Sequence, residues 1–262
     1  LRPRKNHKHR GKIMKKLFAI LPVFLALPIS AEAENGLMFV RTLRGNAEIS
    51  AQSAKIKQGE LAVAKDAKIS ASAEGFASVA FSNYSSCMVL SGKVSIEKFE
   101  QEKVQTASLP LYSEMESSNI VFAIDEGEAV FARGEFRPAS SFKIKTKFGT
   151  IEPVGNNIKI KTDGSTLTVR AYDAAIRYSK PDSNDREYIP IGYDLVCHFE
   201  NGELKAEKKQ SSIPQKASLK SEAGSASDVF KTTEFYRGED GKICARRIAF
   251  KEFFIRTRDP IR

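Results

Sequence analysis

The amino-acid sequence predicts an all-β fold of many short strands, arranged as a β-sandwich or a short β-solenoid. Apolar and polar residues alternate in several short runs, and glycines fall at short intervals between these runs. The same part of the chain has no window of 12 residues with a convincing apolar helical stripe. We expect residues 36–200 to form this domain, which is large enough to bury a hydrophobic core.

Residues 14–33 have the composition of a secretion signal. Lys15 and Lys16 form a basic head, Leu17–Ile29 is apolar, and small residues precede a cleavage point after Ala33. We therefore expect a bacterial protein that is periplasmic or secreted. An uncleaved membrane anchor is the alternative, but the apolar run is shorter than the ~20 residues that a membrane-spanning helix needs. Residues 1–13 precede Met14, and we expect them to be upstream translated sequence.

The formal net charge is +10, but residues 1–33 are rich in Lys and Arg. The exported chain would therefore carry little net charge, with a near-neutral body and a mildly basic C-terminal tail. A basic pI that comes from a leader does not indicate a nucleic-acid-binding protein, so no nucleic-acid partner is expected.

Within the body, three alternating runs are typical of half-buried strands. They are Phe142–Phe148, Ile158–Lys161 and Thr166–Tyr172. Asp163-Gly164 separates the last two, and this dipeptide between alternating runs predicts a β-hairpin.

The C-terminal part of the chain has a different composition. Residues 203–228 are rich in Lys, Glu, Ser, Ala and Gln and poor in large apolar residues, which predicts a flexible linker. Residues 229–262 are expected to form a basic hairpin, with Val229–Arg237 pairing with Lys242–Phe250 around a Gly-Glu-Asp-Gly turn. An amphipathic helix over Ile243–Arg256 is the alternative. Either form should dock on the body or on a partner, because a lone hairpin is marginally stable.

Three cysteines would remain after cleavage of the leader. This odd number does not favour a disulfide scaffold. Cys87 lies in an apolar run and is predicted to be a buried small hydrophobe. Cys197 and Cys244 could form a disulfide in an oxidising compartment, provided that their Cα atoms come within bonding range.

The sequence shows no constellation for a specific reaction. It has no nucleophile-elbow, phosphate-loop or zinc-protease motif, and His198 is the one histidine after the leader. Cys197 and His198 are neighbours and would point to opposite faces of a strand. Residues 182–187 depart from a calcium loop and predict a polar turn. Glu126 and Glu128 could act as paired carboxylates, although solvated surface residues are the simpler interpretation. We expect a protein that is not an enzyme and that has no metal or cofactor.

A set of lysines is the candidate ligand-binding site. If the two strands that carry them are neighbours, five ammonium groups would share one face and could attract an anionic polysaccharide or a lipid headgroup. The alternative is a solvated outer face on which lysines prevent edge pairing. The residues are Lys143, Lys145, Lys147, Lys159 and Lys161.

The sequence of residues 75–90, GFASVAFSNYSSCMVL, resembles the FecR-like family, which is named for the periplasmic part of a ferric-citrate signalling regulator. Residues 93–99, 120–130 and 142–149 resemble further strands of that family, so the likeness covers about residues 40–180. A departure lies at residues 154–156, where Val-Gly-Asn replaces the family's Arg-Gly-Thr.

The resemblance implies a non-enzymatic, all-β extracytoplasmic module. Transmembrane regulators of the family also place an anti-sigma region and a spanning helix before the periplasmic part, and this sequence shows neither. The resemblance therefore implies the extracytoplasmic half of the function only. We expect a binding or signalling module whose partner is an envelope protein or an anionic polysaccharide. The alternative is a cell-envelope structural protein that contacts anionic polysaccharide or outer-membrane components through the lysines. The sequence leaves the oligomeric state open.

Overall fold

The computed structural model of the chain describes residues 33–104, 117–183, 185–211 and 224–248. The expected leader lies outside the described residues except for Ala33. The described part of the chain contains no helix with the length and apolarity needed to cross a membrane.

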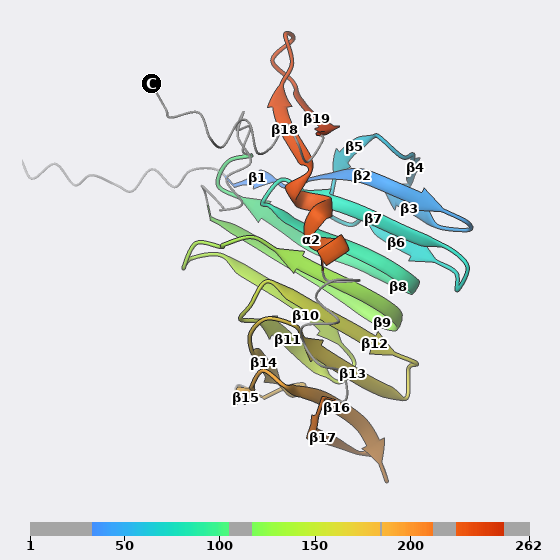
Figure 1. Cartoon of the computed structure of the whole chain (residues 1–262), viewed down its shortest axis with the longest axis vertical. Coiled ribbons are helices and arrows are strands. Elements are labelled where there is room, and N and C mark those ends of the chain that lie inside the picture. Colours follow the sequence, from blue (N-terminus) through green and yellow to red (C-terminus); the bar gives the residue numbers. More distant parts are fainter. Residues whose placement is uncertain (1–32, 105–116, 184, 212–223, 249–262) are drawn as a thin grey trace, which may run out of the picture. The chain divides into compact units, whose positions relative to one another are not determined.

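The structure is built from strands, which confirms the predicted all-β class. Within the described residues, seventeen strands join into one hydrogen-bonded mixed sheet, and a separate hairpin follows a short helix (Figure 1). The predicted runs at 142–148, 158–161 and 166–172 correspond to β10 (Ser141–Thr146), β12 (Asn157–Thr162) and β13 (Thr166–Ala171). The strands of the sheet are β1 (Glu34–Asn35), β2 (Leu37–Arg44), β3 (Glu48–Ala51), β4 (Ala54–Ile56), β5 (Leu61–Val63), β6 (Lys68–Ala71), β7 (Phe76–Phe81), β8 (Ser85–Gln101), β9 (Ser118–Arg133), β10 (Ser141–Thr146), β11 (Gly149–Pro153), β12 (Asn157–Thr162), β13 (Thr166–Ala171), β14 (Ile176–Ser179), β15 (Glu187–Ile189), β16 (Tyr193–Glu200) and β17 (Glu203–Gln210).

The two long strands β8 and β9 organise the sheet. They pair antiparallel from Ser85↔Arg133 to Gln101↔Ser118, and the register shifts on both sides of the pair Gly92↔Gly127. Both glycines have positive φ, 75° at Gly92 and 125° at Gly127. The two backbones form a bulge at this point and lie so close together that a Cβ atom on either glycine would clash with the backbone of the other strand.

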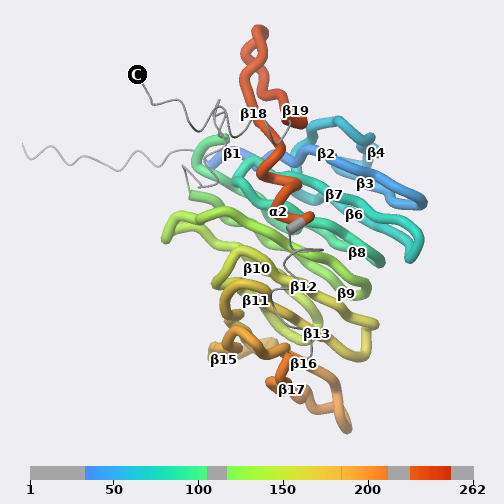
Figure 2. Tube along the Cα trace, in the orientation of Figure 1, coloured from blue at the N-terminus to red at the C-terminus, as the bar shows by residue number. Residues whose placement is uncertain are grey.

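On either side of this bulge, β8 and β9 pair with different neighbours, so the sheet has two arms. Residues 85–91 of β8 and 127–133 of β9 belong to the first arm, and residues 92–101 and 118–124 belong to the second. The parallel pair β9–β10 in the second arm makes the sheet mixed. The order in the first arm is β5-β2-β7-β8-β9-β12-β13-β16-β17, and in the second arm β4-β3-β6-β8-β9-β10-β11-β14-β15. Figure 2 traces β8 and β9 through the middle of the sheet.

One hydrophobic core joins the inner faces of the two arms. Phe81 of the first arm contacts Phe99 of the second, with ring centroids 5.8 Å apart. Phe122 and Phe131 come from opposite halves of β9, and their centroids are 5.0 Å apart. The two arms therefore pack face to face, as the sheets of a sandwich do, although β8 and β9 run through both.

Helix α2 (Gly224–Lys231) covers the outer face of the first arm over β7, β8 and β9. Val229 and Phe230 of the helix pack in a second apolar cluster with Met88 and Val130, which point away from the core. This cover explains the near-continuous apolar sequence of residues 76–81 of β7, 87–90 of β8 and 129–132 of β9, since strand segments buried on both faces lose the alternation of a half-buried strand. Figure 1 shows α2 lying over these strands.

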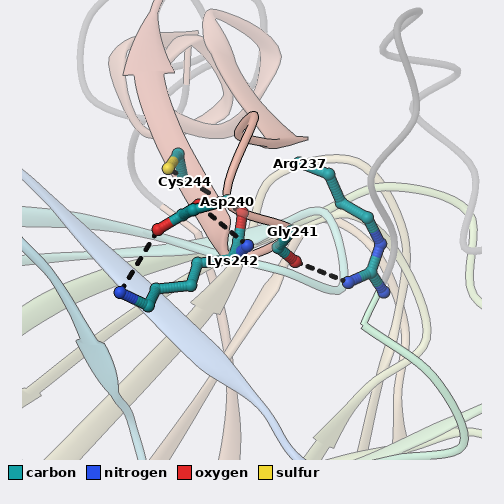
Figure 3. Close-up of polar contacts among 5 residues, drawn as sticks. All are labelled: Arg237, Asp240, Gly241, Lys242 and Cys244. Atoms are coloured by element: carbon teal, nitrogen blue, oxygen red, sulfur yellow. Dashed lines mark hydrogen bonds and ion pairs between the residues drawn. The ribbon is translucent and has the colours of Figure 1, made fainter.

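The hairpin predicted in the C-terminal tail is confirmed. It consists of β18 (Thr233–Arg237) and β19 (Ile243–Arg247). Figure 3 shows that its turn is closed by its own residues, since Asp240 accepts a hydrogen bond from the Lys242 backbone and pairs with the Lys242 ammonium at 3.2 Å. The alternative helix from Ile243 is wrong where the structure describes it, and residues 249–262 of that prediction lie outside the described residues.

The predicted flexible linker over 203–228 differs from the structure. Residues 203–210 form β17, which pairs along its full length with β16, and residues 224–228 begin α2. Residues 229–231, which were expected to begin the first strand of the hairpin, instead form the end of α2. The charged composition of β17 reflects its place at the end of the first arm, where Leu204 and Ala206 contact the core and the other face meets solvent. Residues 212–223 lie outside the described residues.

Candidate binding cleft

Arg41 of β2 fastens the C-terminal end of α2 to the sheet. Its guanidinium donates hydrogen bonds to the backbone carbonyls of Val229, at 2.9 Å, and Thr232, at 2.7 Å. It also donates to the hydroxyl oxygens of Thr232 and Thr233. The last carbonyls of a helix have no partner within the helix and carry partial negative charge, so a cation that donates to them stabilises the helix end.

Buried serines hold α2 from the side. The Ser86 hydroxyl on β8 donates to the Ala226 carbonyl at 2.6 Å, and the Ser227 hydroxyl donates to Asn157 Oδ1 at 2.7 Å. Together with Arg41, these bonds connect α2 to strands more than 60 residues away in the sequence.

Next to Arg41, a cleft of about 860 Å³ opens between α2, the end of β19 and the outer face of the first arm. Its floor is apolar and includes Phe76, Met88 and Val229, and its polar lining includes Asp228 and the two arginines Arg41 and Arg247. The remaining lining residues are Thr42, Ser78, Ser225, Thr232 and Ile248.

The two arginines give the cleft an unbalanced positive charge. Burial and, secondly, repulsion from Arg247 lower the pKa of Arg41 to about 10. The hydrogen bonds of the Arg41 guanidinium go to the C-terminal end of α2. The exposed Arg247, in contrast, has no ion-pair partner in the described part of the chain. An anionic group bound between the two guanidinium groups would relieve this repulsion.

The arrangement suits binding of a ligand that is both anionic and apolar. The apolar floor would bury hydrophobic groups, and the exposed guanidinium would accept a carboxylate with two parallel hydrogen bonds.

The lysines predicted to form a binding face do not come together. Lys143 and Lys145 lie on β10 and Lys159 and Lys161 on β12, and these strands pair with opposite ends of β9, so they are not neighbours. Most of the ammonium groups have carboxylate partners, and Lys147 lies over the Phe148 ring. The pairs are Lys143–Glu152 at 3.8 Å, Lys145–Glu97 at 2.7 Å, Lys159–Glu128 at 2.6 Å and Lys161–Glu128 at 3.7 Å.

The disulfide that Cys197 and Cys244 could have formed is absent from the structure. All three cysteines are free, and the Cys244 sulfur lies 3.9 Å from the Lys242 carbonyl in the hairpin (Figure 3). Cys197 is buried in β16 of the core, as Cys87 is in β8. Cys244 lies in β19, which follows the helix on the outer face, whereas Cys197 lies on the inner face. The sequence alone could not show that the two cysteines belong to opposite faces.

The other candidate residues are spread over the sheet. Cys197 is buried and the adjacent His198 is partly exposed, as expected for neighbours on opposite faces. Glu126 and Glu128 flank the bulge at Gly127, and Glu128 is occupied by two lysines. These carboxylates differ in environment and do not form a free pair.

Sequence reasoning missed both arginines of the cleft. Arg41 is surrounded by an ordinary strand sequence, and Arg247 belongs to a generally basic tail. The available signal was the unusual apolar continuity of residues 76–81 and 86–90, which indicates that something covers the outer face, but not which segment does so.

The solved structures that are similar to this chain include two crystal structures of proteins from Parabacteroides distasonis ATCC 8503, each described as a "putative anti-sigma factor". The first, at 1.65 Å resolution, is 13% identical with a TM-score of 0.38; the match covers 55% of this chain and 60% of the other. The second, at 2.50 Å, is 9% identical with a TM-score of 0.30, covering 71% of this chain and 96% of the other. No family model and no curated protein matches the sequence.

Proposed function

We propose that this chain is a non-enzymatic, extracytoplasmic binding module of the FecR-like kind, and that the cleft beside α2 receives an acidic and partly apolar segment of a protein partner. One observation carries the proposal: Arg247 lines the same partly apolar cleft as Arg41, is close enough to lower the Arg41 pKa, and has no ion-pair partner among the described residues. The FecR-like sequence of residues 75–90 supports it, because it forms β7 and the start of β8, which supply part of this floor.

A protein segment fits the cleft better than a polysaccharide does. Phe76, Met88 and Val229 offer side-chain surface that apolar residues would cover, whereas a polysaccharide would bring hydroxyl groups that lose water without gaining partners there. The lysines that would attract an anionic polymer are separated and mostly paired. For this reason the envelope-polysaccharide alternative has no specific support in the structure.

Synthetic peptides provide a direct test. The probes are fluorescein-labelled ten-residue peptides that alternate Glu or Asp with Leu or Phe, together with matched peptides in which every acid is replaced by its amide. We expect the acidic peptides to bind at low ionic strength and to bind at least tenfold more weakly in 0.5 M salt, since ionic attraction at an exposed guanidinium is screened. Fluorescence anisotropy measures both affinities.

Arg247→Gln should lower the affinity for acidic peptides to that for the amide peptides. Lys55→Gln is the matched control, because Lys55 is an exposed cation that pairs with Glu48 at 2.9 Å on another part of the sheet. Equal binding of acidic and amide peptides, or unchanged binding by Arg247→Gln, would refute the proposed site.

Export needs its own test, because the expected leader lies outside the described residues. Fusing residues 1–40 to alkaline phosphatase, which is active only after export, should give activity in a bacterial host. Replacing Lys15 and Lys16 with Glu should reduce that activity. An inactive fusion that accumulates in the cytoplasm would remove the extracytoplasmic part of the proposal.

A further inference from the structure

Strand β17 ends the first arm, and its outward edge has no pairing partner among the described residues (Figure 1). Ser211, which continues β17, donates its backbone N–H to the Gly192 carbonyl at 2.8 Å. Along an antiparallel pair, the backbone groups of successive residues point alternately towards the partner strand and away from it. The N–H and C=O groups of the odd-numbered residues of β17 therefore point towards β16, and those of Leu204, Ala206 and Lys208 point outward.

The charges of β17 alternate on one face of the strand. The residues at 203, 205, 207 and 209 are Glu, Lys, Glu and Lys, and they stand on the solvent side, opposite to the face on which Leu204 and Ala206 contact the core. In one chain they form weak exposed pairs along the strand, Lys205–Glu203 at 2.8 Å and Lys209–Glu207 at 3.2 Å.

This pattern is self-complementary in one antiparallel register. If Ala206 lies opposite Ala206 of a second copy, each Glu on the solvent face lies opposite a Lys, with Glu203 opposite Lys209 and Lys205 opposite Glu207. Moving the centre to residue 205 or 207 places like charges opposite each other. Centring the pairing on 204 or 208 keeps only half of the complementary contacts.

The backbone is compatible with this register. With Ala206 at the centre, the outward-facing groups at 204, 206 and 208 form three hydrogen-bonded pairs, or about six backbone hydrogen bonds. The charged residues then occupy the non-hydrogen-bonded positions, where opposing side chains are closest. The hydrogen-bond phase set by Ser211 allows antiparallel pairing through these groups, and the charge pattern selects the alignment on Ala206 among the registers that this phase allows.

We propose that β17 is a homodimerisation edge, through which two copies of this chain join their first arms into one continuous sheet by antiparallel β17–β17 pairing centred on Ala206. The charges that protect an isolated edge from unspecific pairing here specify a single partner and a single register. The proposal does not depend on the function of the cleft, since β17 lies at the other end of the first arm from β2.

Two complementary variants of the full chain test this inference. Lys205→Glu with Lys209→Glu gives an all-acidic strand, and Glu203→Lys with Glu207→Lys gives an all-basic strand. Analytical ultracentrifugation should show a concentration-dependent dimer for the wild-type chain, a monomer for each variant alone, and a heterodimer when the two variants are mixed. Glu48→Lys, a charge reversal on β3 of the second arm, should leave the dimer intact.

A wild-type chain that stays monomeric up to its solubility limit overturns the proposal, and so does a dimer that survives in either variant. Circular dichroism checks that the variants keep the wild-type strand signal. If a variant does not fold, single cysteines replace it: Glu203→Cys and Lys209→Cys chains, each with Cys244→Ser, should form an intermolecular disulfide on mixing under oxidising conditions. Failure of the mixture to crosslink then refutes the register.

Discussion

Replacing Gly92 with Ala tests whether the bulge between β8 and β9 determines the fold. A Cβ atom at Gly92 would lie 2.2 Å from the Glu126 carbonyl oxygen and 2.5 Å from the Gly127 Cα. Both are backbone atoms, which cannot move aside as the end of a flexible side chain can. The residue also has a φ of 75°, which L-residues other than glycine rarely adopt.

The expected cost has two parts. Holding alanine at positive φ costs about 1–2 kcal/mol, partly offset by the roughly 0.4–1 kcal/mol gained from a more restricted unfolded chain. The clash with the backbone adds about 1–3 kcal/mol, the usual range for overpacking. The sum of about 1–5 kcal/mol is a substantial fraction of the ~5–15 kcal/mol that stabilises a typical folded domain.

Gly164→Ala is the matched control for the steric part. Gly164 has a similar φ of 82°, but no atom lies within 4 Å of the position that its Cβ would take. The two variants therefore share the conformational cost and differ in the clash. In urea denaturation followed by circular dichroism, Gly92→Ala should unfold at a urea concentration about 0.5–1.5 M lower than Gly164→Ala. Equal midpoints would refute the argument that the close approach of two backbones fixes the bulge.

Three further predictions follow from buried or hydrogen-bonded groups. A maleimide should label Cys244 in the native chain, and Cys87 and Cys197 only after denaturation, because burial raises the pKa of Cys197 to about 11 and that of Cys87 further; rapid native labelling of all three would contradict this. Hydrogen bonds lower the pKa of Asp163 from 3.8 to about 2, so their stabilisation is present above about pH 4 and is lost as the pH falls towards 2. The urea midpoints of wild type and Asp163→Asn should therefore differ at pH 6 and converge near pH 2, and a constant difference would refute it. Tyr178→Phe should lower the free energy of unfolding in urea by about 1–3 kcal/mol, because the carbonyl that the buried hydroxyl reaches at 2.6 Å loses its partner; an unchanged midpoint would argue otherwise.

The all-β class could be predicted because the half-buried strands display their periodicity directly. In β10, β12 and β13 the apolar residues face one core and the polar residues face solvent, so alternation marks each strand. The turn at Asp163-Gly164 was also predictable, because Gly164 supplies a positive φ and Asp163 accepts hydrogen bonds from the following backbone.

The arrangement of the strands in space could not be predicted in the same way. Alternation shows that a residue belongs to a face, but not which strand lies beside it, and this is why Lys145 and Lys159 were expected on one face. In the structure β9 changes neighbours from β10 to β12 near Gly127. In the sequence, nothing distinguishes the glycine of this bulge from the other glycines. The candidate cleft was hidden for a related reason, since Arg41 meets Thr232 across 191 residues of sequence.

The C-terminal helix and hairpin belong to the domain and are not an appended tail. Without α2, the outer-face residues Met88 and Val130 would be exposed beside the partly buried Leu90, which would leave an apolar patch on the sheet. The guanidinium of Arg41 would also lose its acceptors on the helix end. The strands of the sheet, which precede α2 in the sequence, thus carry the apolar surface and the arginine against which the helix packs. Because the cleft is bounded by both, any ligand that contacts Arg247 and the apolar floor together depends on this long-range docking.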